Sequence, residues 1–227
     1  MSAAHQRGAF YGRRQGKRLR PKQAAGLSGT LPGLSIDCTG PVRPDALFSD
    51  DKSAFWLEIG FGGGEHLINN ARLHPDVGHL GCEPFINGLA KLVLQIGEND
   101  LDNIRLHNDD AVQLLDQLPD ASLDRVYLLY PDPWPKRRHF KRRFVSIENL
   151  ARIARVLKPG GEFRFASDID HYVGWTLARI LRSPDFVWTA HEPDDWRKPW
   201  ENWPSTRYEA KAIREGRQSS YITARRV

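Results

Sequence analysis

Short apolar runs that alternate with helical patterns constrain the fold of this chain more than any other feature. The apolar runs predict strands over residues 54–59, 78–82, 103–107, 123–130, 162–166, 186–189 and 221–225. Helical spacing predicts helices over residues 65–72, 87–97, 111–118, 143–157 and 171–181. This alternation, with brief connections, indicates an α/β fold with a parallel sheet and helices on both faces.

The first fifty residues differ from the rest in composition. Residues 1–50 are rich in Gly, Pro, Ser and Arg without a sustained apolar period. We interpret them as a mobile basic arm and a loop-rich lead-in, and we expect the folded domain over residues 51–227. Before Ile36 the arm carries seven basic residues and no acid: Arg7, Arg13, Arg14, Lys17, Arg18, Arg20 and Lys22. The alternative is a solvated tail with no function.

Composition excludes several classes of protein. The chain contains no stretch of 18 apolar residues, so we expect no membrane span, and its start lacks the apolar segment of a secretory signal. The two cysteines, Cys38 and Cys82, make no metal-ligand pattern. We therefore expect a cytoplasmic protein with reduced thiols and no metal.

Acidic residues follow five of the predicted strands. They are Glu58, Glu83, the pair Asp109 and Asp110, Asp132, and Asp168. In parallel α/β sheets the ligand lies beyond the carboxyl ends of the strands. A fold without function has little reason to line this edge with carboxylates, so the pattern predicts a ligand site there.

Glycines directly after the first strand predict a nucleoside cofactor. Gly60, Gly62, Gly63 and Gly64 permit a tight turn and close approach to a ligand. Glu58, expected to face that ligand, would repel a pyrophosphate and favour a cation such as S-adenosylmethionine. We expect Glu83 to bind ribose hydroxyls and an acid after the third strand to bind the adenine amino group, but the sequence does not choose between Asp109 and Asp110.

A proline-rich loop follows the fourth strand. The run Tyr130-Pro131-Asp132-Pro133-Trp134-Pro135-Lys136 is stiffened by three prolines and exposes an acid and an indole, which suits stacking and hydrogen bonding of a planar base. A basic run follows at once, and we expect it to bind RNA phosphates. Its members are Lys136, Arg137, Arg138, Lys141, Arg142 and Arg143.

Several segments together resemble the bacterial tRNA (guanine-N7)-methyltransferases of the TrmB type. They are LEIGFG at 57–62, GCEP at 81–84, YPDPWPK at 130–136, ASDID at 166–170, TRYE at 206–209 and the basic arm at 11–20. The resemblance implies a Rossmann-like class I S-adenosylmethionine-dependent methyltransferase fold. In that fold a mostly parallel seven-stranded sheet has an antiparallel last strand. It also implies methylation at N7 of guanine 46 in the tRNA variable loop.

The resemblance also implies roles for single residues. The cofactor-binding set it implies is Glu58, Gly60, Gly62, Glu83, Asp110 and Asp132. The substrate-binding set it implies is Lys136, Asp168, Thr206, Arg207, Tyr208 and Glu209. We assign the leading catalytic role to Asp132, as a positioning and electrostatic group, because guanine N7 carries a lone pair and needs no general base.

Other interpretations stay open. Asp168 and Thr206–Glu209 could cap helices, and Trp196, Trp200 and Trp203 could be core, lid or a wall beside the base. The chain could instead methylate exocyclic amines of RNA, or be a non-enzymatic RNA-binding protein on the same fold. A nicotinamide enzyme is disfavoured by Glu58.

Overall fold

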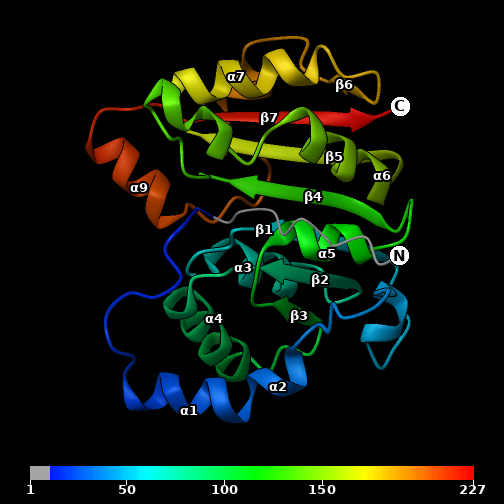
Figure 1. The fold of residues 1–227 in the computed structure, drawn as a ribbon, viewed down its shortest axis with the longest axis vertical. Helices are drawn as coiled ribbons and strands as arrows, with labels where there is room; N and C mark the ends of the chain where they lie inside the picture. Colours follow the sequence, from blue (N-terminus) through cyan, green and yellow to red (C-terminus); the bar gives the residue numbers. More distant parts are fainter. Residues whose placement is uncertain (1–10) are drawn as a thin grey trace, which may run out of the picture.

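A computed structural model describes residues 11–227, so Arg7 of the predicted arm lies outside the described residues. Its centre is one seven-stranded sheet (Figure 1). The strands are β1 Ala54–Ile59, β2 Val77–Cys82, β3 Ile104–His107, β4 Leu123–Leu129, β5 Leu157–Ser167, β6 Phe186–Trp188 and β7 Ser220–Arg226. The main helices are α3 Glu65–Leu73, α4 Ile86–Glu98, α5 Ala111–Gln117, α6 Ile147–Val156, α7 Asp170–Ile180 and α9 Arg207–Arg214.

The strand order confirms the predicted fold class. It is β3-β2-β1-β4-β5-β7-β6, and β1 to β5 pair in parallel. β7 runs antiparallel to both β5 and β6. Because the order reverses between β1 and β4, the connections leave a crevice beyond the carboxyl ends of these two strands.

Apolar side chains cover both faces of the sheet. On one face, α5, α6 and α7 bury Leu114, Ile153 and Tyr172 against strand residues such as Leu57 and Phe163. On the other face, α3 and α4 cover the β1–β3 half with a second apolar cluster. The β4–β7 half of that face is covered by an aromatic cluster of Tyr127, Tyr221, Trp200 and Trp203 instead of a long helix.

The lead-in contains helices where the sequence analysis expected loops. α1 spans Pro21–Gly29, α2 spans Leu31–Leu34, and a 3-10 turn, η1, spans Pro44–Leu47. Pro21 begins α1, and the Gln23 side chain accepts a hydrogen bond from the Arg20 backbone N–H at 3.0 Å. α1 packs on α4. The apolar pattern of α1 is too short to predict a helix from the sequence alone.

Two predicted boundaries were also wrong. The sixth helix begins at Ile147 rather than at residue 143, because residues 137–142 form a 3-10 helix, η2 Arg137–Arg142, and Ser146 provides the N-cap. β5 begins at Leu157, five residues early, because Leu157 already pairs with Leu123 of β4, before a register shift after which pairing resumes at Glu162.

The carboxyl ends of the parallel strands meet at one edge of the sheet, on the left in Figure 1. α9 and the N-terminal segment lie at the same edge (Figure 1). Among residues 11–227, no helix has the length and apolar character needed to cross a membrane.

Candidate active site

A cavity of about 630 Å³ opens at this edge of the sheet. Its volume lies within the usual range for sites of small ligands and cofactors. Most of its wall comes from the ends of β1, β2 and β4, the start of α5, the proline loop (residues 130–136) and α9. Of the predicted cofactor residues, the structure brings together Gly60, Gly62, Glu83, Asp110 and Asp132 on this wall.

The conformation of the glycine turn depends on a hydrogen bond to the Glu83 carboxylate and on the close approach of α4. Gly62 has a φ of +56°, and its backbone N–H donates to Oε2 of Glu83 at 2.8 Å. The N–H of Phe85 donates to Oε1 of Glu83 at 2.9 Å. A side chain at Gly88 on α4 would lie 2.1 Å from the Gly62 carbonyl oxygen, so Gly88 lets α4 approach the turn. The sequence analysis did not identify Gly88.

Three carboxylates give the wall its electrostatic character. Burial raises the pKa values of Glu83, Asp110 and Asp132, while backbone hydrogen bonds act in the opposite direction at Glu83 and Asp110. Each Glu83 oxygen already accepts one hydrogen bond and keeps a lone pair for a ligand hydroxyl. These carboxylates can accept hydrogen bonds from cationic groups and hydroxyls of a ligand, and the same wall also carries cationic side chains, among them Arg13, Lys141 and Arg207.

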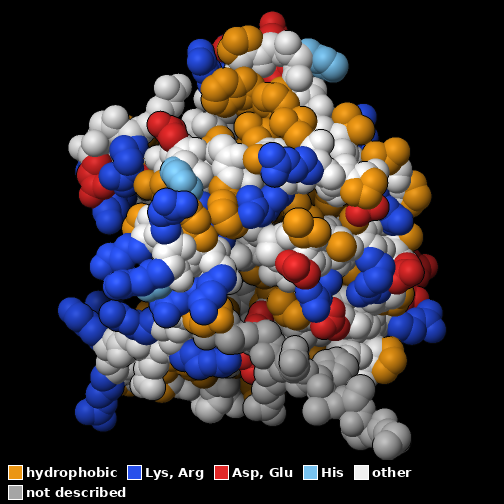
Figure 2. Space-filling view, turned by 45° about the horizontal axis from the view of Figure 1, so that its top comes forward, with side chains coloured by type: hydrophobic (Ala, Val, Ile, Leu, Met, Phe, Trp, Pro, Cys, Tyr) orange, Lys and Arg blue, Asp and Glu red, His pale blue; other side chains and the backbone are white. Residues whose placement is uncertain are grey.

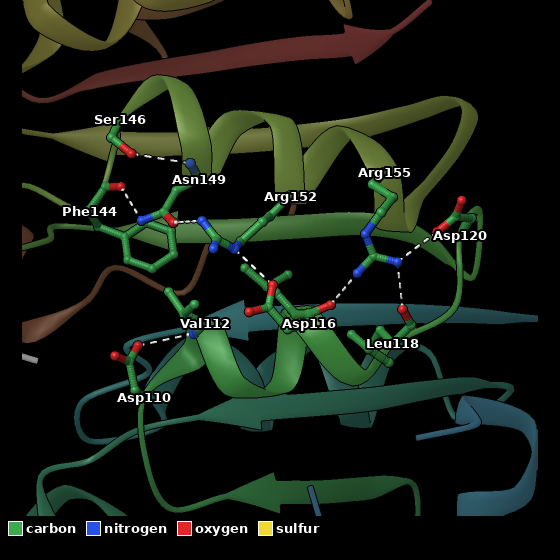
Figure 3. A network of polar contacts seen from close by, with 11 residues as sticks. Asp110, Val112, Asp116, Leu118, Asp120, Phe144, Ser146, Asn149, Arg152 and Arg155 are labelled. Atoms are coloured by element: carbon green, nitrogen blue, oxygen red, sulfur yellow. Dashed lines mark hydrogen bonds and ion pairs between the residues drawn. The ribbon is translucent and has the colours of Figure 1, made fainter. Parts of the chain in front are cut away.

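The structure distinguishes Asp110 from Asp109. Asp110 lines the cavity and caps α5, and its Oδ1 accepts the Val112 N–H at 3.0 Å (Figure 3). The Asp109 carboxylate instead pairs with Arg14 at 2.7 Å and is absent from the described cavity wall. Asp110 is therefore the acid of this pair that a cofactor in the cavity would meet.

Ion pairs join α6 to the end of α5 and to the loop that follows it. Arg152 Nε donates to Asp116 at 2.8 Å, and Arg155 pairs with Asp120 at 2.7 Å (Figure 3). Arg155 also donates to the Leu118 carbonyl. These contacts hold the C-terminal end of α5 against α6, and Asn149 and Arg152 on α6 reach the cavity wall.

Glu58 does not reach the cavity in this structure, contrary to the expectation that it faces the ligand. It is 3% exposed, and His66 on α3 donates from Nδ1 to its Oε2 at 2.7 Å. The strand alternation directs the side chain of Glu58 toward α3 and the aromatic cluster. The Glu58 carboxylate therefore lies behind the residues that line the cavity and does not line it itself.

The proline loop holds Asp132 in a strained backbone. Tyr130 and Trp134 have φ values of +48° and +42°, a region that costs a non-glycine residue roughly 1–3 kcal/mol. No residue between 11 and 227 donates a hydrogen bond to the Asp132 carboxylate, which faces the cavity. Such a group is available to a ligand.

α9 places two of its predicted substrate residues at the cavity and two inside the protein. Arg207 and Tyr208 line the wall, and the Tyr208 ring lies parallel to that of Tyr130 at 6.4 Å. Thr206 caps the helix, since its Oγ1 accepts the Glu209 N–H at 3.2 Å. Buried Glu209 accepts from Trp203 Nε1 at 2.7 Å and from the Tyr221 hydroxyl.

The other predicted substrate residues lie outside the cavity wall. Lys136 is exposed, and its carbonyl accepts the His139 N–H. Asp168 pairs with Arg217 at 2.6 Å and does not cap α7. Trp200 and Trp203 pack in the aromatic cluster, which favours the interpretation as core residues over that of a wall beside the base. Trp196 is half-buried and stacks with Arg197.

The basic run divides into three kinds of residue. Arg137, Arg138 and Lys141 on η2 are exposed, and Lys and Arg gather on the left of Figure 2, the side of the strand ends. Arg142 is half-buried, with its guanidinium 5.0 Å from the Tyr11 ring and 4.9 Å from the Trp134 ring. Arg143 is 3% exposed, so the expectation that it contacts RNA is corrected by its burial.

The N-terminal segment reaches the site, which the sequence analysis did not predict. Tyr11, Gly12 and Arg13 line the cavity. The Arg14 carbonyl accepts the Ile86 N–H at 2.9 Å, and the Gly16 N–H donates to the Asn87 side chain at 2.7 Å. We call residues 11–20 the strap. A Gly- and Arg-rich segment gives no apolar pattern, so only its contacts reveal its place.

Comparison with known proteins identifies the family of this chain. The pattern of a family described as "Putative methyltransferase" matches residues 52–221. A tRNA (guanine-N(7)-)-methyltransferase of Chelativorans sp. (strain BNC1) is 56% identical, over 96% of this chain and 95% of that protein. One of Agrobacterium fabrum, with the same name, is 57% identical over 95% and 94% of the two chains.

Solved structures share the fold at low identity. The 16S rRNA methyltransferase KamB has a TM-score of 0.54 and 17% identity, covering 79% of this chain and 94% of its own. A SAM-dependent O-methyltransferase from Thermotoga maritima has a TM-score of 0.52 and 16% identity, covering 93% and 67%. The fold is thus that of the class I methyltransferases, and the chain belongs to the family of the tRNA (guanine-N(7)-)-methyltransferases.

Proposed function

We propose that this protein transfers a methyl group from S-adenosylmethionine to N7 of guanine 46 in the variable loop of tRNA. The observation that carries the proposal is the cavity at the strand ends, where Glu83, Asp110 and Asp132 converge. The names of relatives that are 56–57% identical over nearly the whole chain support the substrate and the target atom.

The residues on the wall suit the parts of this cofactor. Glu83 has free lone pairs for the ribose hydroxyls, and Asp110 can accept the adenine amino group. Asp132 and, from behind the wall, Glu58 contribute negative potential for the cationic end. When bound, the cofactor supplies an electrophilic methyl group on a positively charged sulfur.

Asp132 and the tyrosines can then act on the base. Guanine N7 carries an in-plane lone pair and no proton, so the protein must orient the base and stabilise charge. Tyr130 and Tyr208 offer parallel rings beside Asp132 against which a purine can stack. The Asp132 carboxylate accepts the N1–H and amino edge of guanine and favours the positive charge that develops on the purine.

Exposed cations around the cavity are suited to hold the RNA. Arg137, Arg138 and Lys141 lie directly after the proline loop, and the strap adds Arg13, Lys17, Arg18 and Arg20. Phosphate contacts position a nucleic acid without reading its sequence. Double-helical RNA hides N7 in a deep narrow groove, so the target must lie in a loop or an opened tertiary contact.

The test is transfer of isotope-labelled methyl from S-adenosylmethionine to an unmodified tRNA transcript, followed by nucleoside analysis. We expect label in 7-methylguanosine. Label on an exocyclic amine would replace the proposal with the alternative chemistry, and tRNA binding without any transfer would indicate a non-enzymatic RNA-binding protein.

A further inference from the structure

The loop that carries the catalytic aspartate needs support from outside itself. Pro131, Pro133 and Pro135 have no backbone N–H, and the described residues provide no hydrogen bond to the Asp132 side chain. The backbone is held in the left-handed region at both ends of this Pro-Asp-Pro segment. Strain of this kind persists only when surrounding contacts impose it.

Arg143 provides such a contact from behind the loop. Its Nε donates to the Pro133 carbonyl at 2.8 Å, one residue beyond Asp132. The side chain is 3% exposed and borders the same cavity as Asp132 and Trp134. A guanidinium taken out of water at this position can contact an RNA phosphate only if the loop is displaced.

Arg143 is itself held by α7. Its guanidinium carbon lies 4.1 Å from the Phe140 ring, 4.9 Å from the Tyr172 ring and 4.8 Å from the Trp175 ring. Its Nη2 donates to His171 Nδ1 at 3.0 Å. The planar guanidinium makes these stacking contacts and both hydrogen bonds at once, which an ammonium group cannot do.

α7 also fixes the backbone next to Arg143. The Tyr172 hydroxyl accepts the Val145 N–H at 3.3 Å, and Trp175 Nε1 donates to the Val145 carbonyl at 2.8 Å. Tyr172 packs in the main core against Phe165 of β5. A continuous set of contacts therefore runs from the sheet through α7 and Arg143 to the proline loop.

We infer that Arg143 is a positioning residue that holds Asp132 at the reacting centre, and that it is not part of the RNA-binding run beside it. This inference rests on the proposed function. Arg138, five residues earlier on η2, is exposed and serves as the matched comparison. The two arginines are close in sequence and differ in what they contact.

The experiment compares Arg143→Lys and Arg143→Met with Arg138→Lys and Arg138→Met. Single-turnover methylation is measured at saturating tRNA and cofactor, and tRNA affinity is measured across a salt series. We expect Arg143→Lys to lower the single-turnover rate at least tenfold and Arg143→Met at least a hundredfold, with the salt slope unchanged. Arg138→Met should reduce the slope by roughly 0.7–0.9, and Arg72→Met, at an exposed arginine in the last turn of α3, should keep both the rate and the slope.

Hydrogen exchange gives a readout that is independent of activity. Amides of residues 130–136 should exchange faster in Arg143→Lys than in the wild type, while β4 and β5 keep their protection. A wild-type rate with a smaller salt slope in the Arg143 variants would make Arg143 an RNA contact and overturn the inference. Loss of cooperative unfolding in both variants would overturn it too, because the arginine would then support the fold as a whole. Inactive wild-type protein would instead contradict the proposed function.

Discussion

The acids of the cavity wall and the basic rim around it carry opposite charges and differ in their exposure to solvent. The basic rim consists of Arg137, Arg138 and Lys141 on η2 and of Arg13, Lys17, Arg18 and Arg20 in the strap. The acids of the wall, Glu83, Asp110 and Asp132, follow buried strands, and Glu83 is buried, Asp110 is half-buried and Asp132 reaches solvent. The cations of the rim lie on η2 and the strap, exposed to solvent. Desolvated charges act strongly over short distances, whereas exposed ones are screened and act by their number. We therefore propose that the wall acids act in the chemistry and that the rim cations hold the RNA.

The largest loss of methyl-transfer rate is expected for a substitution at Asp132 on the cavity wall. Asp132→Asn should lower the single-turnover rate by about a hundredfold or more, because it removes the charge that stabilises the reacting purine and offers a donor where the guanine edge also donates. tRNA affinity should change little. Exposed Asp51→Asn is the control. A wild-type rate in Asp132→Asn would remove Asp132 from the reacting centre.

A smaller effect is expected for cofactor binding. Glu83→Ala should weaken S-adenosylmethionine binding by roughly 1–3 kcal/mol, the usual contribution of charge-assisted hydrogen bonds. Calorimetry measures it, with the exposed Glu98→Ala at the end of α4 as the control. Tight binding of NAD in place of S-adenosylmethionine would contradict the assignment of the wall.

Substitutions in the basic rim should change the salt dependence of tRNA binding. Replacing Arg137 and Arg138 together by Gln should reduce the slope of log K against log salt by about 1.5, at roughly 0.7–0.9 for each phosphate that the protein no longer neutralises. Cofactor affinity should stay unchanged. The control is Arg72→Gln in the last turn of α3, which runs back from the strand ends. An unchanged slope would mean that η2 is not the RNA-binding surface.

The pH dependence gives the smallest effect. Burial raises the pKa values of the three wall acids, so they take up protons at a higher pH than ordinary carboxyls do. A bound cation favours their ionised forms. Affinity for S-adenosylmethionine should therefore fall as the pH is lowered, beginning above about pH 4, where exposed Asp and Glu titrate. Titration calorimetry across this range checks the direction, and rising affinity would contradict it.

The wall was predictable from sequence because local patterns fix it. Glu83 and Asp132 follow apolar strands, and parallel strands bring their carboxyl ends to one edge. Contacts between distant segments were not predictable. Glu58 turns toward His66, and Arg143 turns inward to rings on α7, although Arg137, Arg138 and Lys141 of the same basic run are exposed. A charge count shows that a run is basic, but only packing shows which of its members reach solvent.

We propose that the acids of the cavity wall present a guanine N7 lone pair to the methyl group. The most direct measurement uses a tRNA in which guanine 46 is replaced by 7-deazaguanine, which keeps the base-pairing edge and the ring shape but has carbon in place of N7. We predict tRNA binding close to that of the unmodified transcript and no methyl transfer. Transfer to the 7-deaza tRNA at the unmodified rate would contradict the account, because the methyl group would then be going to another atom or another nucleotide.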